Sequence, residues 1–539
     1  MNKIKELLET LNPQMEELIP FINENIQKLK SNISESGSLY STDQVVLITY
    51  PDQFQSEDRS YLQNLDKFLE NEMEGEFSHV HILPFYPWTS DDGFSPINYH
   101  EVCKEYGEWS DVKSLNPGKM VDCVFNHLSS KSPLFLKALD GDKKYMDMFH
   151  FFDDETYKDK SFQENISKVV RPRTSPLLTP FKVGEKTMHV WTTFGPDQVD
   201  TNISNKDMVK YLLECFFLYI EKGAEFFRVD AVPFMWKELG TDCSHHEKTH
   251  AFVKLMRAIA QEINPKLLII TESNVPHQEN ITYWGNGSDE AHVVYNFSFA
   301  PLLLHGMTFG NNQLLNQWAK DVFKIPDECA FLNFTSTHDG IGLRGLEGIA
   351  SEDDVLAMCS HAKERGGKIG MKTGANGEQK PYELNITWSS YLEDKELKED
   401  ELVRKIANSH ALAMFLPGIG AHYVHNFFGT KNWQEGYEKS GIPRRLNRKK
   451  FSYPLDLSGH ETSVMKRMLD LIRKKKSFEQ FHPKASFEVV ELNPGVFSFL
   501  RGESPVLVAF NLENKKNEIE CKGKSFELAP YELLIQELS

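Results

Sequence analysis

Short apolar runs, rich in β-branched and aromatic residues, recur along most of the chain and predict buried strands. Helix-like stretches such as DMVKYLLECFFLYIEKG and THAFVKLMRAIAQEIN separate several of them. This alternation is typical of a parallel sheet covered by helices, and eight runs predict a closed (β/α)8 TIM barrel in an α/β protein. We expect the strands at residues 45–50, 79–85, 120–127, 225–232, 267–273, 292–299, 330–339 and 419–426.

Two intervals between the predicted strands are too long to be simple connections, so each is expected to build a subdomain or a lid. The second of them carries GGKIGMKTGANGEQKPYELN, whose glycine and lysine content indicates a mobile loop. Before the first strand, the chain reads as one or two helices followed by a SNISESGS spacer.

The pattern changes again after the last predicted barrel strand. A helix, ETSVMKRMLDLIRKKK, precedes the short strands SFEVVEL, VFSFLRG, PVLVAFNL, NEIECKG and ELAPYELLIQEL, which predict an antiparallel β-domain. We therefore expect an N-terminal helical extension over 1–42, a barrel over 43–127 and 200–451, an inserted subdomain B over 128–199, a second insertion or lid after strand 7 over 340–405, and a linking helix with a C-terminal β-domain over 452–539.

The charge of the chain narrows the classes of partner. A formal net charge of −18 at pH 7 argues against nucleic acid or an anionic membrane, because both need a dense basic surface. The N-terminal stretch MNKIKELLETLNPQMEELIPF is amphipathic with acids throughout, unlike an export signal or a membrane span. We expect a cytoplasmic monomer or homodimer that acts on small molecules.

Polar side chains stand at the carboxyl ends of several predicted strands. These ends meet at one rim of a barrel, where its reactive groups are placed. In EFFRVDAV, Arg228 and Asp230 share one face of a strand, so the guanidinium is expected to hold the carboxylate ionised. The pair alone is equally typical of a structural ion pair. The polar residues at the strand ends are Asn126, His127, Arg228, Asp230, Glu272, His338 and Asp339.

Three of these residues are carboxylates that can meet in one cavity. Two carboxylates about 5 Å apart serve retaining glycoside chemistry, in which one attacks the anomeric carbon and the other gives and takes back a proton. Asp230, with Arg228 beside it, suits the first role. Glu272 follows the apolar run LLII with no cation next to it, so a raised pKa is expected. Asp339, beside His338, is expected to bind sugar hydroxyls and favour a distorted ring.

Four stretches, MVDCVFNH, FFRVDAV, IITES and STHD, resemble the signature segments of the α-amylase superfamily (glycoside hydrolase family 13) in order and spacing. Within it, LITYPD, VHILPFYPW, DDGFSPINY, RPR, FGPDQVDTN, STHDGIG and RRLNR resemble the sucrose phosphorylase subfamily, from about residue 45 to 450. The resemblance implies a hexosyltransferase-type enzyme: a retaining α-glucosyl phosphorylase that converts a small α-glucoside and phosphate to α-D-glucose 1-phosphate through a covalent glucosyl-enzyme.

The resemblance also implies roles for single positions. Asp230 would be the nucleophile, Glu272 the acid/base and Asp339 the transition-state stabiliser. The residues implied to line the pocket of the transferred glucosyl unit are Asp91, Phe94, His127, Gln198, Arg228, His338 and Arg444.

Asp91 and Arg444 would close the far end of this pocket, with Arg448 a rival for the place of Arg444. A pocket closed in this way binds one sugar ring at a chain end and excludes interior cutting of a polymer.

Phosphate has to enter beside two carboxylates, which requires cations or backbone donors on loops. RPR in the first long insertion is the matching element, with Arg173 the preferred phosphate ligand and Tyr382 of the PYELN segment its partner. The alternative is that these arginines are surface charges that pair with an acidic protein. Hydrolysis is then the nearest rival outcome.

The acceptor side departs from the sucrose phosphorylase pattern. PFMWKELGTDCSHHEKTH follows the nucleophile, SNVPHQEN follows Glu272, and Glu383 follows the tyrosine of PYELN. KELGTxC and ESNVPHxEN are more similar to relatives that act on glucosylglycerate, and glucosylglycerol and sucrose 6-phosphate are neighbouring possibilities. Lys237, His245 and His246 could bind an acidic acceptor, although such residues on a polar loop are more often solvated. The residues expected on the phosphate and acceptor side are Arg173, Phe234, Lys237, Asn274, Tyr382 and Glu383.

We expect no metal and no cofactor, with inorganic phosphate as co-substrate. No run of acids follows Asn126 and His127, and the two adjacent histidines 245 and 246 have no partner at zinc-ligand spacing. The seven scattered cysteines are expected to be reduced thiols. Two alternatives stay open: an α-glucosidase or transglucosidase with the same three carboxylates, and an inactive sugar-binding amylase-like protein.

Overall fold

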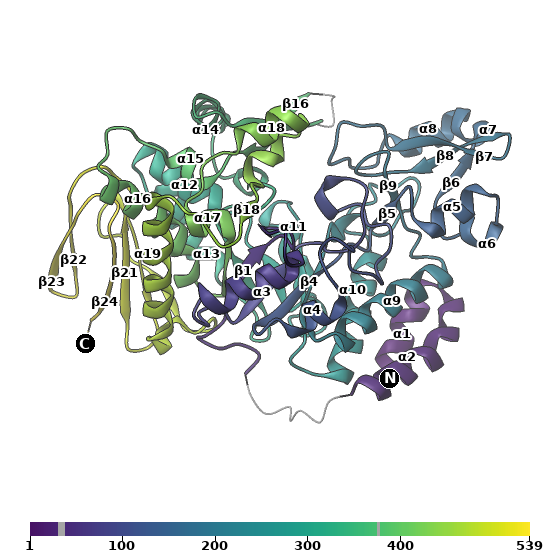
Figure 1. The fold of residues 1–539 in the computed structure, drawn as a ribbon, viewed down its shortest axis with the longest axis horizontal. Coiled ribbons are helices and arrows are strands. Elements are labelled where there is room, and N and C mark those ends of the chain that lie inside the picture. The colour runs from purple at the N-terminus through teal and green to yellow at the C-terminus, as the bar shows by residue number, and fades with distance from the viewer. Residues whose placement is uncertain (31–37, 374–377, 539) are drawn as a thin grey trace.

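The computed structural model describes residues 1–30, 38–373 and 378–538. Most of the predicted SNISESGS spacer and residues 374–377 of the predicted lid loop lie outside the described residues. Within the described ranges, Figure 1 shows the N-terminal helices at one end of the molecule and the C-terminal strands at the other.

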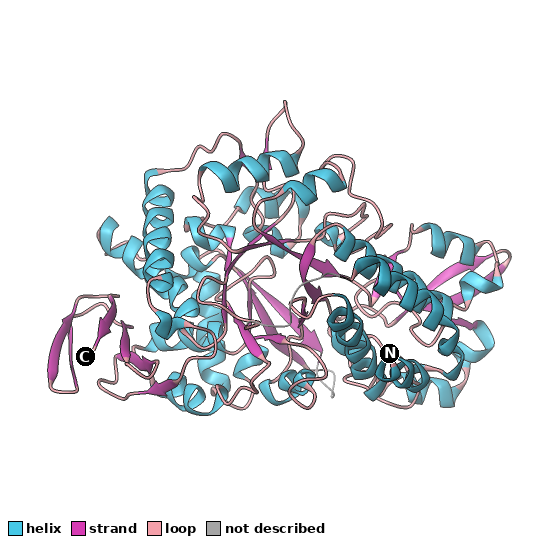
Figure 2. Ribbon diagram, turned by 90° about the horizontal axis from the view of Figure 1, so that it is seen from below, coloured by secondary structure: helices cyan, strands magenta, loops and turns pink. Residues whose placement is uncertain are grey.

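Eight parallel strands close into a barrel, which confirms the fold class (Figure 2). Around the barrel the order is β1, β17, β13, β12, β11, β10, β4 and β3, so strands that follow one another in the chain are neighbours. All five residues of β1 are buried, as expected when helices cover a parallel sheet. The strands are β1 (Val45–Thr49), β3 (His79–Ile82), β4 (Gly118–Cys123), β10 (Ala224–Val229), β11 (Leu268–Thr271), β12 (Val293–Tyr295), β13 (Ala330–Asn333) and β17 (Ile419–Tyr423).

Several strands are shorter than predicted, because the polar residues at their carboxyl ends leave the ladder. β4 ends before Asn126 and His127, and β13 ends at Asn333, ahead of His338 and Asp339. These side chains therefore lie beyond the ends of the barrel strands, at the rim.

Helices surround the barrel (Figure 2). α9 (Lys206–Glu221) begins where the side chain of Asn205 accepts a hydrogen bond from the Met208 N–H, and most of its apolar residues are buried. The other helices of this layer are α3 (Tyr61–Asn71), α4 (Trp109–Ser114), α10 (Glu247–Ile263), α11 (His277–Asn280), α12 (Phe299–Phe309), α13 (Gln313–Val322), α16 (Glu399–Ala411), α17 (Val424–Phe428) and α18 (Gln434–Ser440). The N-terminal helices α1 (Asn2–Leu11) and α2 (Ile19–Leu29) pack on α10, and α2 also contacts α9.

The first long insertion is closed at its base by β5 (His127–Ser129) and β9 (Gln198–Asp200), which pair antiparallel. This pairing brings Gln198 back to the rim beside His127, with 3.3 Å between their side-chain nitrogens. The remaining elements of the insertion are α5 (Pro133–Leu139), α6 (Lys143–Met146), β6 (Phe151–Asp153), α7 (Asp154–Lys158), α8 (Lys160–Ile166), β7 (Leu178–Val183) and β8 (Lys186–Trp191).

The second insertion contains a three-stranded antiparallel sheet in the order β14 (Ile341–Gly342), β16 (Gln379–Asn385) and β15 (Lys368–Thr373). The glycine- and lysine-rich stretch predicted as a loop is therefore mostly a hairpin. Its strands can approach closely because Gly370 has no side chain: a Cβ there would lie 2.6 Å from the Glu383 side chain. The hairpin is accompanied by α14 (Glu352–Glu364) and α15 (Trp388–Leu392).

The C-terminal region holds the predicted helix, α19 (Gly459–Lys476), and a four-stranded antiparallel sheet. The stretch ELAPYELLIQEL, predicted as one strand, is split around its proline, because proline cannot continue a ladder. The sheet consists of β19 (Phe487–Val489), β20 (Val496–Arg501), β21 (Val506–Asn511) and β24 (Leu533–Glu537), and β22 (Asn517–Cys521) pairs with β23 (Lys524–Leu528).

The seven cysteines are free thiols, as predicted, and six of them are buried. Over the described ranges, no helix combines the length and the apolar character that crossing a membrane requires.

Candidate active site

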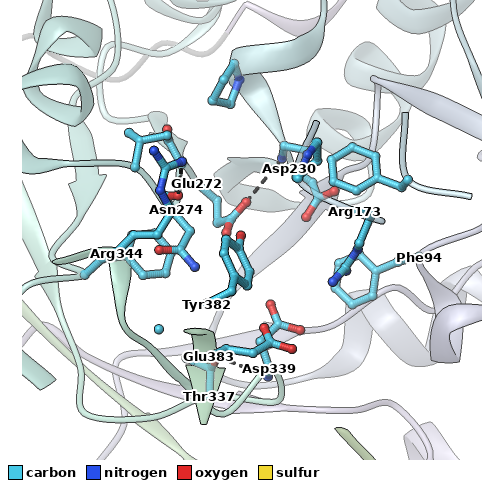
Figure 3. A pocket seen from close by; sticks show the side chains of 18 of the residues that line it. Phe94, Arg173, Asp230, Glu272, Asn274, Thr337, Asp339, Arg344, Tyr382 and Glu383 are labelled. Atoms are coloured by element: carbon cyan, nitrogen blue, oxygen red, sulfur yellow. Dashed lines mark hydrogen bonds between the residues drawn. The ribbon is translucent and has the colours of Figure 1, made fainter. Parts of the chain in front are cut away.

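A cavity lies at the carboxyl end of the barrel and is lined by segments that follow seven of its strands, including both insertions (Figure 3). Most residues that the sequence predicts for the site meet here. They are Asp91, Phe94, His127, Arg173, Gln198, Asp230, Phe234, Glu272, Asn274, His338, Asp339, Tyr382, Glu383 and Arg444. The structure thus brings together side chains from segments hundreds of residues apart in the chain.

Asp230 stands directly after β10 and accepts a hydrogen bond of 2.7 Å from Arg228. Arg228 itself does not line this cavity. It is 2% exposed, lies beneath Asp230, and also donates to the buried carboxylate of Asp122. Burial raises the pKa of Asp230 above its usual value, and the charge of Arg228 opposes that rise. Arg228 therefore acts in the predicted direction, but burial outweighs it.

Glu272 lies beside Asp230 on the next strand end. Its Oε2 accepts a hydrogen bond of 3.2 Å from the Ala231 N–H and stands 3.8 Å from Nη2 of Arg228 (Figure 3). Ala231 adopts φ 51°, a strained backbone conformation of the kind found at functional sites, and this turn directs its N–H toward Glu272. Burial raises the pKa of Glu272 to about 7, and Asp230 and Asp339 add to the rise while Arg228 opposes it. The raised pKa agrees with the prediction.

Asp339 is held by cations. Burial opposes its ionisation, but Arg444, His338 and Arg448 outweigh burial and lower the pKa of Asp339 well below its usual range. Nη1 of Arg444 lies 2.7 Å from Asp339 Oδ1, and Nη2 of Arg448 lies 3.3 Å from the same oxygen. Asp339 is therefore a permanent anion in the cavity, unlike Glu272.

The geometry distinguishes the two rival arginines. Arg444 lines the cavity and is shared between Asp339 and Glu383, whose Oε2 lies 2.9 Å from Arg444 Nη2. Arg448 lies behind the cavity, 2% exposed, and donates to Asp92 at 2.8 Å. Glu383 lines the cavity too, but both its carboxylate oxygens accept hydrogen bonds from Arg444. It therefore orients that arginine.

The predicted sugar-binding side chains form one connected wall. The rings of Phe94 and His338 stack with centroids 5.0 Å apart. The carbonyl of Phe94 accepts hydrogen bonds from His127 at 2.8 Å and from Gln198 at 3.0 Å. These bonds tie the first insertion to the loop that carries Asp91 and Phe94.

Lys237 does not line the cavity where the other residues predicted for the acceptor side meet. Its side chain is 2% exposed, and its ammonium lies 2.9 Å from Asp200 and donates to Asn126 at 2.9 Å. A buried carboxylate needs a counter-charge, which Lys237 supplies. His245 and His246 also lie outside the lining: His245 contacts Tyr283 and Glu279, and His246 caps α10.

Two arginines at the acceptor side remain available to a ligand. Arg173 forms no hydrogen bond or ion pair with any other residue that the structure describes, so it is not a surface charge neutralised by the acidic protein. Beside it, burial raises the pKa of Tyr382 to about 12 even though Arg173 opposes the rise. Arg344 also lines the cavity and was missed by sequence reasoning. Its only signal there is its place five residues after Asp339 in the loop STHDGIGLRG.

The other lining residues are mostly small or apolar, and sequence reasoning assigned them no role in the site. They are Pro172, Phe194, Ala231, Pro233, Ser273, Val275, Phe297, Phe334, Thr337, Gly340 and Gly342. The described residues contain no group of three or more histidine, cysteine, aspartate or glutamate side chains that could hold a metal ion.

Comparisons with known proteins agree with this arrangement. The model of the alpha-amylase family, described as the alpha amylase catalytic domain, matches residues 50–339. The glucosylglycerate phosphorylase of Escherichia coli (strain K12) is 38% identical over 501 residues, which cover 90% of this chain and 88% of that protein. The sucrose phosphorylase of Bifidobacterium adolescentis is 28% identical over 76% of this chain and 80% of that protein.

Among solved structures, the sucrose 6F-phosphate phosphorylase from Thermoanaerobacter thermosaccharolyticum superposes with a TM-score of 0.76 at 25% identity. The match covers 91% of this chain and 98% of that one.

Proposed function

Because this chain belongs to the alpha-amylase family, and within it to the phosphorylase subfamily of glycoside hydrolase family 13, we propose that it transfers glucose from glucosylglycerate to inorganic phosphate. The products are α-D-glucose 1-phosphate and glycerate, and the reaction is reversible. The observation that carries the proposal is the meeting of three carboxylates and an unpartnered arginine, Arg173, in one cavity.

In the first step, Asp230 attacks the anomeric carbon while protonated Glu272 gives its proton to the glycosidic oxygen. The bond between that carbon and oxygen breaks, glycerate leaves with its hydroxyl restored, and a glucosyl ester of Asp230 remains. A pKa of about 7 allows Glu272 to carry the proton at neutral pH. The two carboxylates contact the same guanidinium, that of Arg228, which keeps them side by side.

In the second step, an oxygen of hydrogen phosphate attacks the same carbon from the side that glycerate has left. The ester bond breaks, Asp230 regains its negative charge, and the phosphate gives its proton to Glu272. Arg173 binds the phosphate, since a guanidinium pairs well with phosphate oxygens. Asp339 stays ionised throughout and stabilises the positive charge that develops on the sugar ring.

The choice of glycerate as acceptor rests on similarity. Three glucosylglycerate phosphorylases are 36–39% identical to this chain over at least 90% of its length. The sucrose phosphorylases are 25–28% identical over 76–84%. The acceptor segments after Asp230 and Glu272, which depart from the sucrose pattern, point in the same direction.

The decisive experiment supplies glucose 1-phosphate with glycerate, glycerol, fructose or fructose 6-phosphate and measures phosphate release. We expect release with glycerate, and loss of activity in Asp230→Ala. A protein that forms free glucose from its glucoside, with no glucose 1-phosphate when phosphate is present, would instead be a hydrolase.

A substitution of Arg173 tests its role in binding phosphate separately from the chemistry of the carboxylates. Arg173→Gln removes a charge-assisted contact worth about 1.5–3 kcal/mol, so the KM for phosphate should rise roughly 10- to 150-fold. Arg59→Gln is the matched control, because Arg59 is exposed and pairs with Asp58 at the surface. An unchanged phosphate KM in Arg173→Gln would exclude Arg173 as the phosphate ligand.

A further inference from the structure

The cavity holds more positive charge than phosphate binding by Arg173 uses. Five carboxylates and three arginines line it. Of the arginines, Arg444 is occupied by Asp339 and Glu383. Arg344 is the third, and neither the motifs nor the steps above give it a role.

We propose that Arg344 binds the carboxylate of the acceptor and so selects small 2-hydroxy acids over neutral polyols and sugars. This inference rests on the proposed function, because it assigns the acceptor half of the same cavity.

The guanidinium of Arg344 has capacity for a ligand. Nη1 donates a hydrogen bond of 3.1 Å to the carbonyl of Asn274. Nε lies 3.4 Å from Glu347 but is buried without a hydrogen-bond partner. Nη2 makes no hydrogen bond or ion pair with any residue in the described part of the chain. Nη2 and the second N–H of Nη1 are therefore left for a ligand, and a guanidinium can bind a carboxylate through such a pair of parallel hydrogen bonds.

The ion pair with Glu347 neutralises little of the positive charge of Arg344. Its side chain is 40% exposed, and it also pairs with Lys372. An exposed carboxylate shared between two cations contributes little to either of them. The side chain of Arg344 is 18% exposed, so an anion in the cavity meets it in a less screened environment.

The position of Arg344 fits the acceptor and not the glucosyl unit. Its partner Asn274 comes two residues after Glu272, the group that protonates the departing oxygen of the acceptor. Figure 3 shows Arg344 beside Asn274 and on the other side of the view from Arg173 and Phe94. In glycerate, one hydroxyl stands on the carbon next to the carboxylate. When that hydroxyl oxygen lies at Glu272, the carboxylate falls among the residues next to Glu272, where Arg344 is.

The backbone that carries Arg344 is fixed before any ligand arrives. The Leu343 N–H donates to the carbonyl of Tyr382 at 2.9 Å. Gly345 lies so close to the backbone of Phe297 that a Cβ would stand 2.5 Å from its carbonyl oxygen. Gly342 permits a similar approach to Asn274. A charged group held in this way needs little reorganisation to bind its ligand.

The test measures synthesis from glucose 1-phosphate with sodium D-glycerate, D-lactate and glycerol, in the full-length protein and in Arg344→Gln. Because a hydrogen bond to a charged group contributes about 1.5–3 kcal/mol, kcat/KM for glycerate and lactate should fall roughly 10- to 150-fold. The value for glycerol and the KM for phosphate in the reverse reaction should change less than about threefold. Arg344→Lys keeps the positive charge but not the paired donors of the guanidinium, so it should recover part of the lost kcat/KM. Arg59→Gln should behave as the unmodified protein.

Three results would overturn the inference: equal losses for glycerate and glycerol, a loss confined to phosphate, or an unmodified protein that prefers glycerol to glycerate. If Arg344→Gln does not fold, as judged by its melting curve, Arg344→Lys gives the same comparison between acid and polyol. Failure of the proposed function looks different, because the unmodified protein would then release no phosphate with glycerate.

Discussion

Replacing Glu272 with glutamine tests whether ionisation of this buried carboxyl lowers the stability of the folded protein. The pKa of this carboxyl is raised from 4.5 to about 7, so the folded state binds its proton more tightly than the unfolded state. The contribution of this carboxyl to the free energy of unfolding is therefore fully present below pH 4.5. It is lost as the pH rises through 7, where the carboxyl ionises in the folded state. At about 1.36 kcal/mol per pH unit, the ionised form costs on the order of 3 kcal/mol above pH 7. Glutamine cannot ionise and avoids this cost.

We therefore expect Glu272→Gln to be more stable than the unmodified protein at pH 8 and equally stable near pH 4.5. For a chain of 539 residues, a gain of about 3 kcal/mol corresponds to a rise in melting temperature of roughly 3 °C. The same variant should lose about 10²- to 10⁴-fold in kcat, the typical contribution of a general acid.

The assay is a series of melting curves from pH 4.5 to 8.5, with Glu503→Gln as a control on an exposed glutamate. A gain that does not depend on pH, or a variant that melts below the unmodified protein at pH 8, would refute the argument that burial raises this pKa.

Two further predictions follow from the same charges. Since Glu272 must be protonated when the acceptor leaves, kcat/KM for the glucoside at saturating phosphate should fall about tenfold per pH unit above 7. A profile that stays flat to pH 9 would assign the proton to another group. Lys237→Met leaves Asp200 buried without its counter-charge, so stability should fall by about 3–5 kcal/mol, seen as a lower melting temperature. The acceptor KM of the folded fraction should not change, and a raised acceptor KM with normal melting would restore the role first predicted for Lys237.

The strands and the three carboxylates that meet in the cavity could be predicted because each depends on local sequence. An apolar run is a buried strand wherever it lies, and Asp230, Glu272 and Asp339 follow such runs directly or within a few residues. The carboxyl-terminal ends of the strands were predicted less well, because the polar residues there leave the ladder. β13, for example, ends at Asn333, six residues before Asp339.

The parts that could not be predicted depend on contacts between distant segments. Nothing in the sequence near Lys237 shows that Asp200 will lie beside it, and an isolated lysine on a polar stretch suggests solvent or a ligand. The same holds for Asp197, whose carboxylate accepts hydrogen bonds from Ser90, Ser95 and Ser130 and fastens two loops at the rim. Arg344 was missed for the opposite reason, because a single arginine in a loop carries no signal until the structure shows what it faces.

The arginines on the two sides of the cavity differ in how fully carboxylates pair with them. Around the glucosyl unit, the arginines are saturated: Arg228 is bound by Asp122 and Asp230, and Arg444 by Asp339 and Glu383. The carboxylates therefore dominate where positive charge develops on the sugar ring, and groups already in place there need no rearrangement to stabilise it. On the acceptor side, Arg173 and Arg344 are not saturated. An anion can thus bind next to two carboxylates without meeting a uniformly negative surface, although the protein as a whole carries a net charge of −18. We propose that this separation makes phosphate a competent attacking group where water would otherwise be favoured by its small size and lack of charge.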